Sequence, residues 1–254
     1  MKRVRLVALG LVSVLATGAA LATSAWALEA PEIGRCVSHA GGKYTNSVCT
    51  KLAKGTKAGS FEWEPGAVKN KFSGVGGAAT LETVKKVKVS CKTEASRGEI
   101  KSPKTVGNIE VTFTGCESLE FKCSTPGAKE GEIVTNDLAG TLRWENAAKS
   151  KVALDLVPQT GVRFVEFACG PANAFVEGSV LTNLLVNKTE TVFEEKFAAK
   201  VGKQKPEYYY TATGEKVKDV LMAKIGGSSP LAQAGQTVTN TQTDEEALEI
   251  NTKA

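Results

Sequence analysis

Short segments in which apolar and more polar residues alternate recur along most of the chain. Val152, Leu154 and Leu156 share one face of such a segment, and Phe193 and Phe197 share one face of another. A period of two is typical of a strand with one buried face, and glycine or polar turns separate the segments. No segment has the periodicity of an amphipathic helix of three turns. The pattern predicts an all-β fold, a β-sandwich or a distorted barrel, with few or no helices.

The N-terminus has the three parts of an export signal. Lys2, Arg3 and Arg5 precede an apolar run over residues 6–21, and an Ala-x-Ala site follows at residues 25–27. A retained membrane anchor is the alternative, but the run is shorter than the roughly 20 apolar residues that span a bilayer. We therefore expect residues 1–27 to be a signal peptide and residues 28–254 a single β-rich domain, secreted or on the cell-envelope exterior, with no further membrane span.

The expected compartment decides how the cysteines are interpreted. All six follow the cleavage site: Cys36, Cys49, Cys91, Cys116, Cys123 and Cys169. An even number of cysteines in an exported chain favours disulfides over metal or redox chemistry. Cys36 and Cys49 flank a Gly-Gly turn signal, which favours a bridge across a hairpin or a small loop. Cys116 and Cys123 lie seven residues apart, which favours a second local bridge.

This assignment leaves Cys91 and Cys169 as the third pair. Cys91 shares the apolar face of its segment with Val87 and Val89. In the same way, Cys169 lies on the same face of its segment as Val165 and Phe167. Both cysteines should therefore point inward. A Cys91–Cys169 bridge would join two sheets and close the longest loop.

The charge of the chain gives no reason to expect a nucleic-acid partner. Three of the five net positive charges lie in the signal, so its removal lowers the formal charge from +5 to +2. The remaining lysines are scattered among glutamates, whereas nucleic-acid binding needs them clustered on one face.

Residues suited to catalysis are few. His39 is the one histidine, and it lies inside the Cys36–Cys49 loop. No Gly-x-Ser-x-Gly motif is present, and metal sites of the catalytic zinc type draw on several histidines. We therefore assign no catalytic residue, no metal site and no cofactor.

Two segments could contact a ligand. Residues 61–66 hold Glu62 and Glu64 beside Trp63, and glycosidases need two carboxylates near an aromatic ring. In a strand, however, Glu62 and Glu64 lie on the face opposite Trp63. Tyr208 and Tyr210 could present their rings to a carbohydrate, although tyrosines are also ordinary strand residues.

Five short strings resemble those of a group of exported proteins of soil actinobacteria that has no assigned function. They lie at residues 29–36, 61–66, 103–108, 113–117 and 245–251, so the resemblance spans the expected mature chain. It implies a bacterial exported protein and no particular fold, ligand or catalytic residue.

Two functional hypotheses remain. The first is an exported, non-catalytic binding or envelope-associated protein with an extracellular ligand, a carbohydrate being one candidate. The second is a secreted carboxylate-based hydrolase, which would require two carboxylates in a cleft, one of them with a raised pKa.

Overall fold

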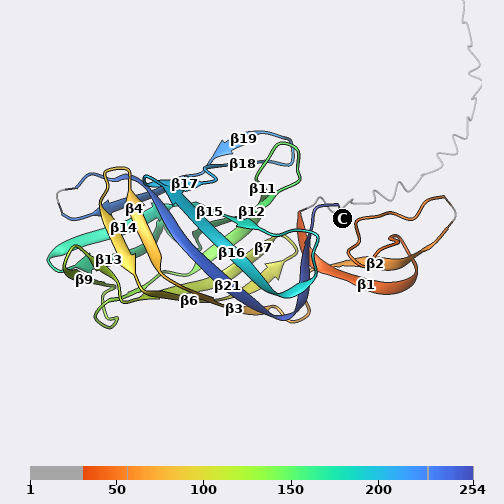
Figure 1. Cartoon of the computed structure of the whole chain (residues 1–254), viewed down its shortest axis with the longest axis horizontal. Coiled ribbons are helices and arrows are strands. Elements are labelled where there is room, and N and C mark those ends of the chain that lie inside the picture. Colours follow the sequence, from red (N-terminus) through yellow and green to blue (C-terminus); the bar gives the residue numbers. More distant parts are fainter. Residues whose placement is uncertain (1–30, 56, 228, 254) are drawn as a thin grey trace, which may run out of the picture.

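A computed structural model describes residues 31–55, 57–227 and 229–253, and these residues form strands, turns and loops without a helix. The signal peptide expected at residues 1–27 lies outside the described residues. Among the residues described there is also no helix with the length and apolar character needed to cross a bilayer. The all-β prediction is confirmed, and the architecture is a closed antiparallel barrel (Figure 1).

Eight strands close the first ring of the barrel. In order around it they are β3 (Lys71–Gly76), β6 (Thr93–Ser102), β7 (Thr105–Thr114), β11 (Leu138–Trp144), β12 (Val152–Pro158), β15 (Val180–Leu184), β16 (Glu190–Lys200) and β21 (Ala232–Asn251), which pairs again with β3. Because every neighbour is paired, this ring has no free sheet edge.

A second ring of strands continues the same wall. It consists of β4 (Ala79–Thr83), β5 (Lys88–Cys91), β8 (Glu117–Ser118), β9 (Phe121–Ser124), β13 (Arg163–Cys169), β14 (Ala172–Gly178), β20 (Leu221–Ile225) and the first part of β21. Gly76 pairs with Glu94 and Ala79 with Cys91 in one unbroken register. The rings are therefore two halves of one tube rather than separate sheets.

The remaining strands are attached to this tube. They are β1 (Glu32–Gly42), β2 (Gly59–Pro65), β10 (Glu132–Val134), β17 (Lys203–Lys205), β18 (Tyr208–Tyr210) and β19 (Lys216–Lys218). Figure 1 shows the β1–β2 hairpin projecting beyond the end of the barrel opposite β9 and β13, and β18 and β19 outside the wall. The hairpin has a small core of its own, made by Tyr44, Trp63 and Cys49.

Alternation along the strands separates the inside of the barrel from the outside. In β11 every second residue is buried, from Leu138 to Trp144, and the residues between are half-exposed. In β12 the outward residues Ala153 and Asp155 are buried as well. The inward residues merge into one apolar core that fills most of the barrel.

The disulfides correct two of the three predicted pairings. Cys36–Cys49 is confirmed, but Cys91 bonds to Cys116 and Cys123 bonds to Cys169. Three disulfides are consistent with an oxidising environment.

The physical reason for the corrections is the order of the strands. Cys91 of β5, Cys116 just before β8, Cys123 of β9 and Cys169 of β13 form one row across neighbouring strands. Cys123 and Cys169 are direct cross-strand partners, and the Cys123 amide donates to the Cys116 carbonyl. Strands lie about 4.8 Å apart, so the ends of this row are about 14 Å apart, beyond the reach of a disulfide. Bridges between direct neighbours in this row can include all four cysteines only if Cys91 bonds to Cys116 and Cys123 bonds to Cys169.

Candidate functional site

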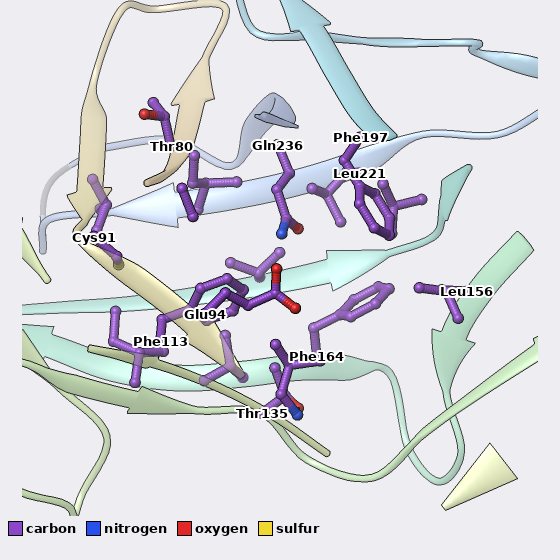
Figure 2. Close-up of a pocket in the computed structure, with 18 of the residues that line it drawn as sticks. Thr80, Cys91, Glu94, Phe113, Thr135, Leu156, Phe164, Phe197, Leu221 and Gln236 are labelled. Carbon is purple, nitrogen blue, oxygen red and sulfur yellow. The ribbon is translucent and has the colours of Figure 1, made fainter. Parts of the chain in front are cut away.

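The inside of the barrel contains a cavity of about 100 Å³ that lies mainly within the second ring. Its walls are apolar except at Thr80, Glu94, Thr135 and Gln236. Figure 2 shows the carboxylate of Glu94 in the middle of this space, with Gln236 pointing toward it from β21 and the rings of Phe164 and Phe197 nearby. A smaller cavity of about 40 Å³ lies farther along the tube, in the first ring, and Glu195 and Asp244 contribute to its walls.

A row of polar residues separates the two cavities. Glu195 on β16 pairs with Asn240 on β21, Asn240 pairs with Gly76 on β3, and Gly76 pairs with Glu94 on β6. The side chains of the three polar residues are all at least nine-tenths buried. We call Glu94, Ser96, Glu195 and Asn240 the polar belt of the lumen.

Two glycines of β3 make room for the polar belt. A Cβ atom at Gly76 would lie 2.5 Å from Oε2 of Glu94, and one at Gly74 would lie 2.2 Å from Oγ of Ser96 and 2.6 Å from Nδ2 of Asn240. Real Cβ contacts do not come so close, so any larger residue would displace these polar groups. The missing side chains at positions 74 and 76 are what allow polar groups to reach across the tube.

Hydrogen bonding within the belt is incomplete. The Asn240 Nδ2 group donates to Oε2 of Glu195 at 3.3 Å and to Oγ of Ser96 at 3.4 Å. Oε2 of Glu94 and Oδ1 of Asn240 are buried and have no partner among the described residues. Both atoms are acceptors, and an unpaired buried acceptor costs about 1–3 kcal/mol. These two acceptors therefore lack a hydrogen-bond donor.

Burial changes the acidity of the lumen carboxyls. It raises the pKa of Glu94 to about 7, with the nearby Glu195 charge as a second cause. Burial likewise raises the pKa of Glu195 to about 7 and that of Asp244 to about 6. None of the residues that line the two cavities is a lysine, arginine or histidine. The lumen thus holds carboxyl groups without a cation.

The sequence-predicted carboxylates Glu62 and Glu64 lie elsewhere, on the β1–β2 hairpin. Glu62 pairs with Lys43 at 3.1 Å, and hydrogen bonds and charge from Lys43 lower its pKa although partial desolvation opposes them. Glu64 pairs with Arg35 at 2.9 Å. Trp63 is 8 % exposed and donates through Nε1 to Glu32. The structure therefore gives the two glutamates ion-pair contacts and buries the ring of Trp63.

Tyr208 and Tyr210 line an open groove of about 310 Å³ together with Glu145, Glu207 and Lys216. The Lys216 ammonium lies 4.1 Å from the ring centre of Tyr208, and Tyr210 of β18 is the strand neighbour of Trp144 in β11. Tyr208 and Tyr210 thus lie at a groove, and their contact with a ligand stays a prediction.

A second cluster of carboxyls lies outside the barrel wall, where residues of the segment carrying β17–β19 pack against it. Arg143 donates through Nε to Asp155 at 3.1 Å and stacks on the ring of Tyr209. Ser179 donates to Asp219 at 2.8 Å. Burial and the neighbouring Asp155 raise the pKa of Asp219 to about 7. This cluster explains why the outward residues of β12 are buried.

Sequence reasoning did not single out the polar belt. The only trace of the polar belt in the local sequence is that Glu94 and Ser96 alternate along one strand, as their partners Gly76 and Gly74 do along another. The barrel register is needed to show that Glu195 and Asn240 belong to the same row.

No group of three or more histidine, cysteine, aspartate or glutamate side chains suited to a metal ion occurs within the part of the chain that the structure describes. No protein-family model, no curated protein and no solved structure matches the chain.

Proposed function

We propose that this chain is an exported, non-catalytic binding protein that takes a small ligand into the lumen of its barrel. One observation carries the proposal: an apolar cavity of about 100 Å³ contains the buried and unpartnered carboxylate of Glu94. Binding sites combine apolar walls with a few polar groups that orient the ligand. Eight-stranded barrels of this width hold either packed side chains or one small ligand.

The size of the cavity limits the ligand. An engineered cavity of about 150 Å³ is filled by benzene, so this one suits a molecule of roughly four to six non-hydrogen atoms. A hexose is larger than benzene and does not fit. The lumen carboxyls therefore do not support the hydrolase hypothesis, although their raised pKa values would suit acid chemistry.

Export agrees with this role but rests on separate observations. The N-terminal pattern of residues 1–27 is that of a signal peptide, and three disulfides suit an oxidising compartment. The resemblance to exported proteins of soil actinobacteria supports a bacterial host.

The test is a titration of the purified exported chain with small alcohols and amines, followed by methyl NMR. We expect intermolecular NOEs between the probe and the lining residues Val176, Val180 and Leu221. Ala79→Leu should weaken binding because it fills the cavity, whereas Thr239→Ala, on the exposed face of β21, should not. If no probe gives NOEs to the lining of the wild-type chain, the proposal is wrong.

The groove at Tyr208 and Tyr210 favours a second binding function, directed at an envelope carbohydrate. Its volume of about 310 Å³ is at the lower end of ligand sites, and aromatic rings beside carboxylates suit stacked sugars. A glycan array probed with the wild-type chain and with Tyr208→Ala tests it. Loss of a glycan signal in that variant, and not in Leu231→Ala, would support this function; an array without any signal would exclude it.

A further inference from the structure

We infer that the ligand of the lumen is a small aliphatic amine, bound with its ammonium group against the carboxylate of Glu94 and its hydrocarbon part in the apolar cavity. This inference rests on the proposed function and adds the chemical class of the ligand.

The first argument is the kind of hydrogen-bonding group that is missing. Oε2 of Glu94 and Oδ1 of Asn240 are both buried acceptors without a partner, and the two residues flank Gly76 in one cross-strand row. Of the two residues only Glu94 lines the cavity, so a ligand there that pairs with its carboxylate must donate hydrogen bonds. An ammonium group offers three donors, an alcohol offers one, and a carboxylate offers none.

The second argument is charge. Glu94, Glu195 and Asp244 line the two lumen cavities, and no basic side chain does so. A buried carboxylate is costly unless a cation pairs with it. A cationic ligand would supply that partner, whereas an anionic ligand would add a like charge next to Glu94.

The third argument separates an amine from a metal ion. A calcium ion takes six to eight oxygen ligands. Besides the two oxygens of Glu94, the lining side chains with oxygen atoms are Thr80, Thr135 and Gln236 with one each, which is fewer than a calcium ion takes. The other lining residues are apolar. These walls suit the hydrocarbon part of an organic cation. The cavity volume of about 100 Å³ limits that part to a short chain.

The position of Glu94 fixes how such a ligand would be oriented. Gly76 provides the space into which the carboxylate turns, and Figure 2 shows that carboxylate central among the lining side chains. The ammonium group would then lie at the polar belt, and the alkyl chain would extend toward Phe164 and Leu221 in the second ring. Since an ionised carboxylate is the better partner for a cation, binding should tighten as pH rises through the range in which Glu94 loses its proton.

The experiment compares three probes of nearly equal size on the full exported chain: n-butylamine, 1-butanol and butanoate. Affinities are measured by calorimetry at pH 8, and methyl NMR locates each probe. We expect n-butylamine to bind about tenfold tighter than 1-butanol, the usual gain for a charge-assisted hydrogen bond, and butanoate to bind weakest. Glu94→Gln should abolish the preference for the amine while 1-butanol still binds.

The outcomes distinguish this inference from the proposed function. If 1-butanol binds in the lumen as tightly as n-butylamine, the lumen is a binding site but its ligand is not an amine. If neither probe reaches the lumen, both proposals are wrong. Glu62→Gln is the matched control, because it removes a half-buried carboxylate on the β1–β2 hairpin, outside the lumen, and it should leave the preference intact. If Glu94→Gln does not fold, the wild-type preference and its loss between pH 8 and pH 5 decide the matter.

Discussion

Gly76 and Glu94 are cross-strand partners, and the carboxylate of Glu94 occupies the volume that a side chain at position 76 would take. A buried acid in a barrel core is thus accommodated by a neighbouring residue that has no side chain. The pair links the backbone of β3 to the chemistry of the lumen.

Replacing Gly76 with alanine should lower the free energy of unfolding by about 1–3 kcal/mol. The new Cβ would lie 2.5 Å from Oε2 of Glu94, 3.1 Å from its Cβ and 3.2 Å from Cγ2 of Val238, so the carboxylate must move within a packed core. Urea unfolding measures the loss. Gly77→Ala is the control, because nothing lies within 4 Å of a Cβ at that position. Equal stability of the two variants would contradict the packing argument.

The chain should be more stable at pH 5 than at pH 8. Burial raises the pKa values of Glu94, Glu195 and Glu249 to about 7 and that of Asp244 to about 6. Between about pH 4.5 and 7 the folded chain therefore holds protons that the unfolded chain has released, and stability falls as pH rises through this window. Each such carboxyl contributes roughly 1–3 kcal/mol.

Urea midpoints measured from pH 5 to pH 8 test this dependence. Glu195→Gln should flatten it, because the amide does not titrate. A midpoint that stays constant or rises over the same range would show that folding does not raise the pKa values of the lumen carboxyls.

Arg143→Ala should destabilise the chain by about 3 kcal/mol. Arg143 is the ion-pair partner of Asp155, whose side chain is 8 % exposed, and its removal leaves that carboxylate buried and unpaired. Arg97→Ala provides the comparison: its pair with Glu110 is largely exposed on the arginine side, and exposed pairs contribute about 0–1 kcal/mol. Thermal unfolding of both variants measures the contrast, and similar losses would mean that solvent reaches Asp155.

Removing the Cys123–Cys169 disulfide by a double alanine substitution should cost more stability than removing Cys36–Cys49. The bridges close loops of 46 and 13 residues, for which chain-entropy estimates give about 4 and about 3 kcal/mol. Non-reducing peptide mapping gives the connectivity directly. A peptide joining Cys91 to Cys169 would contradict the strand order of the second ring.

Local sequence patterns predicted the strands and the direction of many side chains. The alternation of side chains along their strands predicted that Cys91 and Cys169 point toward the interior, and both are buried. It could not identify their partners, because these depend on which strands are neighbours around the barrel. For the same reason the sequence did not predict the polar belt. Glu94 and Glu195 are 101 positions apart in the chain, and only the register of β6, β3, β21 and β16 brings them together.

The strand that closes the barrel is the last to be synthesised of the twenty-one in the part of the chain that the structure describes. β21 pairs with β3 and β4 on one side and with β16 and β20 on the other, over 20 residues. Until it is made, two long rows of backbone amides and carbonyls have no partner, and such edges recruit strands from other chains. Synthesis and docking of β21, more than any single contact, therefore protect this chain from assembling with its own copies.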